Sequence, residues 1–430
     1  MLARGPLRAA TIGAALSASF AITSGAASAQ RPDSTPPPSP MTLLRQSPTE
    51  PSWAATLRFR DAEARYRHDP QWRSAYCQLR AQSEIWLGDH AAALREIARC
   101  WGSWGDTDSS IAAGTRATDA VAMIAAAADT ARIVMVNERH HATSDRLLTL
   151  ELLPILWQKG YRYLAAEAFD SRDTLINQRA YAAAGVTGGY VDEPVFGEIV
   201  REARRLGYTL VAYEAEPPQN AATDSLNPQQ RRDRAQARNL NDRMFRVDPK
   251  AKVLVHAGYA HIKERADDRW SPMAAYLREL TGLDPVTVDQ TMLGEMNEPA
   301  NEHPAYRAAQ AARLVGKRPV ILVDGAGRAI RPATFDVDFQ VLTARTSYVN
   351  GRPTWMTLGG RRRPVDVAVP ECANRQCIVE VLLKSDGDDA VPLDRAEARA
   401  GSVTLFLPAA QLVKIRVLDT NAELLRTIER

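Results

Sequence analysis

The chain has 430 residues, of which 45% are hydrophobic and 24% are charged, and its formal net charge is +3. This length suggests two or three domains, and the composition is ordinary for a globular protein. Because proteins that bind nucleic acids usually carry a marked basic excess, we expect no nucleic-acid partner. Beyond the N-terminal region the sequence has no long apolar stretch, so we expect no integral membrane segment in the mature chain.

The first 29 residues have the three parts of a secretory signal peptide. Arg4 and Arg8 give a positive start, an apolar stretch covers about 9–22, and residues 27–29 (ASA) form a small-x-small cleavage pattern. The alternative is a membrane anchor, but the apolar stretch is short and contains Gly, Ser and Thr. We therefore expect cleavage and export to the periplasm or the extracellular space.

Four cysteines agree with an oxidising compartment. Cys77 and Cys100 flank an expected helical hairpin, and Cys372 and Cys377 lie close together in ECANRQC. An even number of cysteines in an exported protein favours two local disulfides, Cys77–Cys100 and Cys372–Cys377. The alternative is a metal site, which a single CxxxxC without a neighbouring histidine fits poorly.

Three regions follow a Pro-rich linker at residues 30–50. Residues 51–110 have apolar side chains at helical spacing, broken by a Gly-Asp pair, which predicts a helical hairpin cap. Residues 111–300 alternate short β-rich runs with longer helical patterns, which predicts an α/β domain, a Rossmann-like parallel sheet with helices on both faces. Residues 315–430 contain β-rich runs separated by turn residues, so we expect a β-rich, sandwich-like C-terminal domain.

The α/β region has a definite predicted order of elements. In chain order they are a helix at 117–130, a strand at 132–136, a helix at 144–160, a strand at 161–168, helices at about 173–184 and at 193–207, a strand at 208–215, a helix at 228–247, a strand at 252–258, a helix at 271–282 and a strand at 284–291. The expected C-terminal strands are 318–325, 337–349, 353–359, 378–385, 402–409 and 412–420.

Histidines and carboxylates gather where the expected parallel strands end. They are Glu138, His140, His141, Glu167, Glu214, His256 and His261, and Tyr259 lies among them. Open α/β sheets bind ligands at the carboxyl ends of their strands, so we expect these side chains to line one pocket for a small molecule. A single histidine after a strand is more often a loop or core residue, and His256 in particular can point back beneath the sheet. Glu167 ends an otherwise apolar run. A buried carboxylate in this position needs either an ion-pair or hydrogen-bond partner, or a functional role.

Four ordered segments resemble the superfamily of erythromycin esterase, ChaN-type haem-binding and Tiki/TraB proteins. NERHH at 137–141 is similar to its GExH opening, and Glu167 ends the following strand as in that superfamily. RDRAQARNL at 232–240 is similar to an RDxxMAxNL helix, and VLVHAGYAHI at 253–262 to a strand with a G/N-x-x-H turn. The resemblance covers about 115–295.

The sequence departs from this pattern in three ways. Asn137 stands where the superfamily usually has Gly, Gln236 replaces Met, and the cap and the β-rich tail lie outside the resemblance. The superfamily includes ester hydrolases, metal-dependent peptidases and haem binders. The resemblance therefore implies a shared pocket and leaves the reaction open.

The first hypothesis is a hydrolase similar to erythromycin esterase. His140 or His261 would act as general base on a water molecule, because an imidazole titrates near neutral pH. Glu138 and Glu167 would orient the imidazole, and Arg232 would stabilise the developing oxyanion, although a charged helix face is the other explanation of this arginine. The chain has no GxSxG segment, so a serine nucleophile is not expected.

Two alternatives use the same pocket. Glu138, His140 and His261 are suitable ligand types for a divalent metal in a peptidase-like hydrolase, but no HExxH fixes their spacing. A haem binder without enzymatic activity would hold iron through a histidine, Tyr259 or Tyr213. The haem would be noncovalent because the chain lacks CxxCH.

The remaining residues of the expected pocket are assigned to substrate binding. They are His141, His256, Tyr259 and Glu214.

Overall fold

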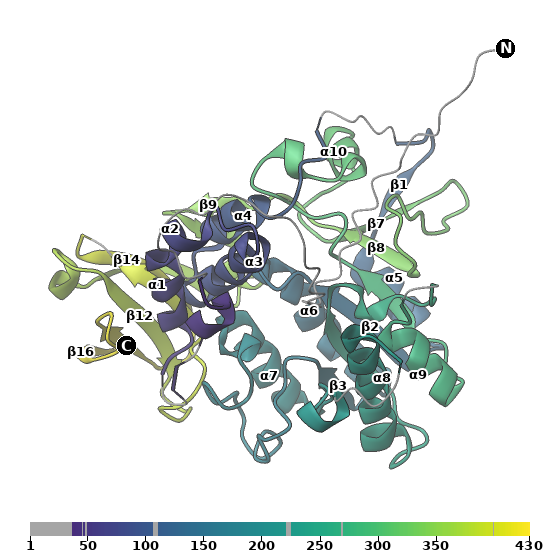
Figure 1. The fold of residues 1–430 in the computed structure, drawn as a ribbon, viewed down its shortest axis with the longest axis horizontal. Coiled ribbons are helices and arrows are strands. Elements are labelled where there is room, and N and C mark those ends of the chain that lie inside the picture. The colour runs from purple at the N-terminus through teal and green to yellow at the C-terminus, as the bar shows by residue number, and fades with distance from the viewer. Residues whose placement is uncertain are drawn as a thin grey trace, which may run out of the picture.

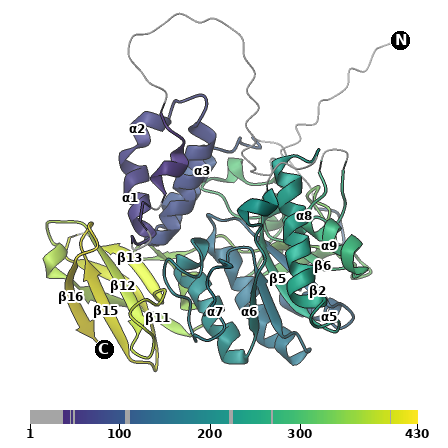
Figure 2. The same ribbon diagram turned by 60° about the horizontal axis from the view of Figure 1, so that its bottom comes forward.

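The structure is a computed structural model (Figures 1 and 2). It describes residues 37–430 except 45, 48–49, 106–110, 221–224, 268–269 and 399. The expected signal peptide and the first part of the expected linker lie outside the described residues. Within the described part of the chain, no helix is both long enough and apolar enough to cross a bilayer.

An eight-stranded sheet forms the centre of the molecule, in the order β1-β7-β8-β6-β2-β5-β3-β4. Its strands are β1 (Arg116–Asp119), β2 (Ile133–Glu138), β3 (Tyr163–Ala166), β4 (Thr209–Ala212), β5 (Val253–Gly258), β6 (Val286–Asp289), β7 (Val320–Val323) and β8 (Phe339–Leu342). The run from β8 to β4 is parallel, whereas β7 pairs antiparallel with β8 and with β1. The α/β fold class expected from the sequence is confirmed.

Helices cover both faces of this sheet (Figure 2). One face carries α5 (Ala120–Ala127), α6 (Arg146–Gln158) and α7 (Pro194–Leu206), and the other carries α8 (Pro228–Leu240) and α9 (Met273–Thr281). Helix α10 (Pro304–Ala311) packs beside β7 and β8. Because both faces are covered, every residue of β2 and β5 is buried, which explains their continuous apolar sequences.

A helical cap packs above one end of the sheet and beside the C-terminal domain (Figure 1). It contains α1 (Trp53–Asp61), α2 (Glu63–Tyr66), α3 (Arg73–Glu84) and α4 (His90–Ala98). Gly88 ends the 3-10 turn Ile85–Leu87 that follows α3, with φ +71°, and a Cβ at this position would lie 2.3 Å from the carbonyl oxygen of Arg395. The turn of the hairpin thus needs glycine, because it approaches the backbone of the C-terminal domain closely. The Cys77–Cys100 disulfide is confirmed, with a Cα–Cα distance of 5.8 Å.

The C-terminal region is β-rich, as expected, and its sheets are antiparallel. One pair consists of β11 (Arg362–Ala368) and β14 (Ser402–Pro408), and the order of the four-stranded sheet is β13 (Asp394–Ala398), β12 (Cys377–Leu383), β15 (Val413–Leu418) and β16 (Leu424–Glu429). Both sheets contribute to one apolar core. A short pair, β9 (Tyr348–Val349) with β10 (Arg352–Pro353), precedes them. The Cys372–Cys377 disulfide is confirmed, also with a Cα–Cα distance of 5.8 Å.

Several elements differ from those expected. Strands β7 and β8 lie beyond residue 315 but belong to the central sheet, because the all-buried β7 pairs with β1. The expected helix at 117–130 begins later, at Ala120, because the Asp119 side chain caps it by accepting from the Ala122 amide at 2.9 Å. The expected strand at 353–359 is instead a 3-10 turn, Thr354–Thr357.

The expected helix at 173–184 is replaced by turns. Here side chains bond to distant backbone and compete with helix formation. The Asn177 amide group donates to the Leu210 carbonyl at 2.8 Å and accepts from the Leu210 amide at 2.7 Å. This segment therefore supports β4 through two hydrogen bonds.

We expect the two disulfides to contribute unequally to stability. They close loops with sequence separations of 23 for Cys77–Cys100 and 5 for Cys372–Cys377. Loop-closure entropy predicts losses of about 3 and about 2 kcal/mol when each pair is replaced by serine. Urea denaturation of the two double-serine variants measures this, and a larger loss for the Cys372/Cys377 variant contradicts it.

Candidate functional site

The site residues expected from the sequence meet at the carboxyl ends of four neighbouring strands. Glu138 ends β2 and lies in register with Gly258, the last residue of β5. Glu167 follows β3, and Glu214 follows β4. This edge of an open parallel sheet is where such folds bind ligands.

Glu138 is the centre of a buried polar network. Its Oε1 lies 3.0 Å from Nδ1 of His140, and its Oε2 lies 2.9 Å from Nε2 of His256. Arg146, which begins α6, donates from Nε to Oε2 at 2.7 Å and from Nη2 to Oε1 at 3.0 Å. Burial alone would raise the pKa of Glu138, but the Arg146 charge and the two histidine hydrogen bonds hold it well below its ordinary value.

The partners of Glu138 are themselves held in place. Arg146 also donates to Glu193 at 2.7 Å, and Nδ1 of His256 lies 2.8 Å from the Thr149 hydroxyl. Both nitrogens of His256 are therefore engaged. This histidine lies beneath the cavity and does not line it, so it supports the site from below.

The His140 ring is fixed on three sides. It stacks on Tyr190 at a centroid distance of 4.4 Å, and Tyr259 meets it edge-on at 5.0 Å. On the third side lies Gly258, where a Cβ would be 2.4 Å from Cε1 of His140. Because an ionised carboxylate only accepts, Glu138 places the proton on Nδ1, and Nε2 is left as an acceptor. No described residue hydrogen-bonds to this Nε2.

Tyr259 has an unusual backbone conformation, with φ +43°. A positive φ is strained for a bulky side chain and persists only where the surroundings impose it. The conformation directs the ring toward His140 and places its hydroxyl 3.4 Å from Nδ1 of His141.

Arg232 of α8 forms a second cluster. Its Nη2 donates to Glu167 and, at 2.6 Å, to Glu214, and its Nε donates to Glu214 at 2.9 Å. Glu167 also accepts from the Gly258 amide at 2.6 Å. Burial favours neutral Glu167, but the charges of His261 and Arg232 outweigh it and hold its pKa well below the ordinary value.

Asp233, the neighbour of Arg232, orients His261. Its Oδ1 lies 2.5 Å from Nδ1 of His261 and accepts from the Met273 amide at 3.0 Å. Its Oδ2 accepts from Trp270 Nε1 and from Gln229 Nε2, each at 2.8 Å. The carboxylate is thus immobilised, and it keeps a proton on Nδ1 of His261.

The pKa of His261 is raised. Burial lowers it, but the Glu167 and Asp233 carboxylates have the larger combined effect. In the neutral ring, Nε2 accepts from Nη1 of Arg232 at 3.1 Å. In the charged ring, an Nε2 proton faces Oε1 of Glu167, 3.6 Å away. His261 therefore stays protonated to higher pH than a free imidazole.

The two clusters open into one cavity of about 260 Å³. The α/β region contributes to its lining His140, His141, Glu167, Tyr190, Arg232, Tyr259, Ala260 and His261, together with Gln229 and Trp270. Its other side is lined by Ser39, Met41, Trp72, Ala75, Gln78, Leu79, Gln82 and Ile97. Glu138 and Glu214 support this lining from behind. Burial and the nearby Arg139 hold the pKa of His141 well below 6.5, so this lining histidine is neutral.

The donor atoms do not fit a metal ion. Among the described residues, no group of three or more His, Cys, Asp or Glu side chains is placed to hold one. Both oxygens of Glu138 already accept hydrogen bonds, and both nitrogens of His261 are engaged. The Arg232 guanidinium occupies the place between two carboxylates that a cation would take. For iron, Tyr213 is not accessible either, because it is buried and its hydroxyl donates to a backbone carbonyl at 3.1 Å.

The sequence did not single out several residues of this site. Arg146 looks like one charge at the start of an apolar helix, and Tyr190 follows a Gly-Gly loop without any signal. Asp233 lies in the segment RDRAQARNL but had no assigned role. The contribution of the cap was not expected, because its apolar spacing is the same as that of an ordinary core face.

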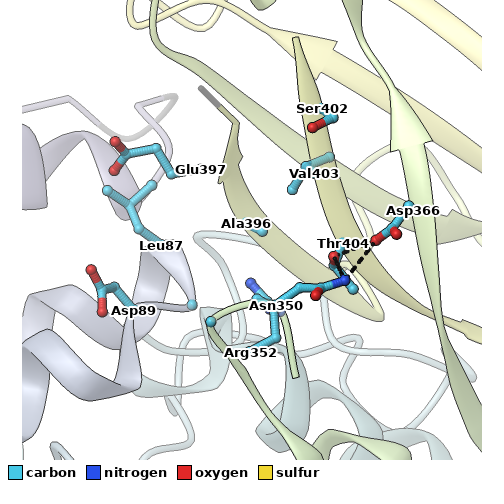
Figure 3. A pocket seen from close by; sticks show the side chains of 12 residues that line it. Leu87, Asp89, Asn350, Arg352, Asp366, Ala396, Glu397, Ser402, Val403 and Thr404 are labelled. Atoms are coloured by element: carbon cyan, nitrogen blue, oxygen red, sulfur yellow. Dashed lines mark hydrogen bonds between the residues drawn. The ribbon is translucent and has the colours of Figure 1, made fainter. Parts of the chain in front are cut away.

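A larger hollow, of about 550 Å³, lies between the cap and the C-terminal domain (Figure 3). Its carboxylates have partners. Asp366 accepts from Thr404 and from Asn350, and Glu397 pairs with Arg60 at 2.6 Å. None of the expected site residues lines it, and it holds no histidine–carboxylate pair. We therefore assign the chemistry to the smaller cavity.

No protein-family model matches the chain, and no curated protein matches it. Solved structures give partial likenesses. One, described as bacterial protein toxins, is 16% identical over 43% of this chain and 38% of that chain, with a TM-score of 0.30. The type III effector HopBA1 is 13% identical over 44% and 90% of the two chains, with a TM-score of 0.29. RRSP, a MARTX toxin effector domain from Vibrio vulnificus CMCP6, is 16% identical over 54% and 47%, with a TM-score of 0.30. The chain thus spans well under two thirds of the first of these structures, and TM-scores this low carry no argument about function.

Replacing Gly258 by alanine tests how tightly His140 is held. The glycine has φ −83°, which any residue adopts, so the effect of the new Cβ is purely steric. We expect the His140 ring to move and the free energy of unfolding to fall by about 1–3 kcal/mol. The measurements are urea denaturation and the NMR signal of the His140 Cε1–H group. Gly316→Ala is the control, because a Cβ there has no neighbour within 4 Å. If Gly258→Ala and Gly316→Ala have the same free energy of unfolding and the same His140 signal, the close approach of Gly258 to the His140 ring is contradicted.

Asp233→Asn tests the charge state of His261. Without this carboxylate we expect the pKa of His261 to fall, as measured by NMR titration of its Cε1–H signal. A raised folded-state pKa stabilises the protein below the unfolded value of about 6.5, and that stability is lost as pH rises through the folded pKa. The free energy of unfolding should therefore decline less above about pH 6.5 in the variant than in the wild type. Asp242→Asn, at an exposed carboxylate, is the control. An unchanged pKa of His261 would show that Asp233 does not set it.

Proposed function

We propose that the protein is an exported hydrolase in which His140 activates water to cleave an ester or a related acyl bond of a small molecule. One observation carries this proposal. Glu138 holds the proton of His140 on Nδ1, and Nε2 is an uncommitted acceptor on a cavity wall. The two disulfides are consistent with export, and the resemblance to erythromycin esterase supports the reaction class.

Glu138 gives His140 the properties of a general base. Water bound at Nε2 transfers a proton to the ring as it attacks the carbonyl carbon, and the ring becomes positive. That charge lies next to the Glu138 carboxylate, which is kept ionised by Arg146 and stabilises it. Positioned proton transfer of this kind contributes about 10²–10⁴-fold to a rate.

His261 and Arg232 supply the complementary functions. Because Glu167 and Asp233 favour the charged ring, His261 can donate a proton to the leaving oxygen. A guanidinium has about five N–H donors. The described contacts of Arg232 use its Nε donor and both Nη2 donors. A charged His261 carries a proton on Nε2 and cannot accept from Nη1, so the Nη1 donors of Arg232 remain for the oxyanion.

The hydrolase is favoured over the other two possibilities. A metal-dependent peptidase would need donors that are already engaged around Arg232 and Glu138. A haem carrier would place anionic propionates beside Glu167, which is ionised. The histidine–carboxylate pairs can act on water without a metal ion and without haem.

His140→Ala tests this function. With p-nitrophenyl acetate as substrate, we expect kcat to fall by about 10²-fold or more, because the general base is lost. The midpoint of thermal unfolding should change little, because the His140 side chain is partly exposed. His68→Ala, at an exposed histidine outside the site, should keep full activity.

Two outcomes would reject the assignment. The first is an active His140→Ala variant. The second is wild-type protein that hydrolyses no ester.

A further inference from the structure

We infer that one face of helix α3 forms an apolar subsite that selects small, neutral substrates with an aliphatic portion. This inference rests on the proposed hydrolase function and concerns the substrate class of the same cavity. The subsite lines the same cavity as His140 and belongs to the cap, which the superfamily resemblance does not cover.

The lining residues of α3 share one face of the helix. Trp72, Ala75, Leu79 and Gln82 have the spacing i, i+3, i+7 and i+10, which places them in one row along a helix of 3.6 residues per turn. All four are half-buried. By contrast, the core-facing Tyr76 is fully buried. The row therefore borders the cavity, and Trp72 and Leu79 also pack against the apolar core of the cap.

The Cys77–Cys100 disulfide holds this wall in place. Cys77 lies on α3 between Ala75 and Leu79 in the sequence, on the face that packs in the cap core, and Cys100 follows the end of α4, which contributes the buried Ile97 to the same cavity. The two helices that carry the apolar wall are thus linked covalently. A fixed wall can select by shape, because it does not adapt to a larger ligand.

The charges at the cavity disfavour an anionic substrate. Two positive groups reach its lining, and both are already paired: Arg232 with Glu167 and Glu214, and His261 with Asp233. Among the described lining residues there is no cation left to neutralise a carboxylate of a ligand. These two cations face three carboxylates, so the formal charge of the cluster is 2 − 3 = −1, which disfavours a second anion.

The volume limits the size of the substrate. Pockets for drug-sized ligands enclose about 300–1,000 Å³. The cavity here, at about 260 Å³, is below that range. An ester or lactone with a short aliphatic chain fits, with the carbonyl beside His140 and the chain along Leu79 and Ala75.

A series of p-nitrophenyl esters tests the subsite in the full chain. From acetate through butyrate to hexanoate we expect kcat/KM to rise by up to about fourfold for each buried methylene, until the cavity is filled. The negatively charged p-nitrophenyl hemisuccinate should be hydrolysed at least tenfold more slowly than the butyrate. Equal rates for the whole series would overturn the subsite.

Two cap variants locate the effect. Leu79→Ala should reduce the advantage of hexanoate over acetate, mainly through KM, whereas Leu280→Ala, at an exposed leucine outside the cavity, should not. Ala75→Phe fills the subsite and should impair hexanoate at least tenfold more than acetate. Its control is Ala126→Phe on the exposed side of α5.

The outcomes separate this inference from the proposed function. If the wild type hydrolyses none of the esters, the hydrolase itself is rejected. If it hydrolyses them, but Ala75→Phe treats acetate and hexanoate alike, the hydrolase stands and the α3 subsite is wrong. Ala75→Phe tests the α3 subsite even if Leu79→Ala fails to fold.

Discussion

The ion pair between Glu138 and Arg146 is the interaction on which the site depends. Both side chains are buried, and an isolated charge in that position would be too costly to keep. The guanidinium keeps the carboxylate ionised, and the carboxylate in turn orients two histidines. Removing Arg146 would leave the buried Glu138 carboxylate without its guanidinium partner, whereas removing Glu138 would leave Arg146 paired with Glu193 alone. This pair therefore links the stability of the fold to the orientation of His140.

Two histidines of the same cavity have different surroundings. His140 has one carboxylate behind it and an open acceptor nitrogen in front. His261 lies between Asp233 and Glu167, which favour its charged form. Under the proposed hydrolase function, these surroundings suit His140 to act as a base and His261 as an acid within one pocket.

Parts of the chain that are distant in sequence complete the site. The loop that carries Tyr190 is held from both neighbouring regions, because Trp86 of the cap donates to the Gly189 carbonyl at 3.1 Å and Arg395 of the C-terminal domain donates to the Asp192 carbonyl at 3.3 Å. Arg395 also donates to the carbonyl of Trp86 at 2.8 Å. The cap and the C-terminal domain thus support the stacking of Tyr190 on His140.

The sequence by itself determined the parallel sheet and the edge at which the histidines and carboxylates gather. Buried strands have continuous apolar sequences, and the carboxyl ends of parallel strands meet at one edge, so Glu138, Glu167 and His261 could be grouped from their positions alone. Only the tertiary structure decided which carboxylate serves which histidine, that Arg146 completes the network, and that the cap forms the opposite wall. These are contacts through space between residues far apart in the chain, and neither periodicity nor composition records them.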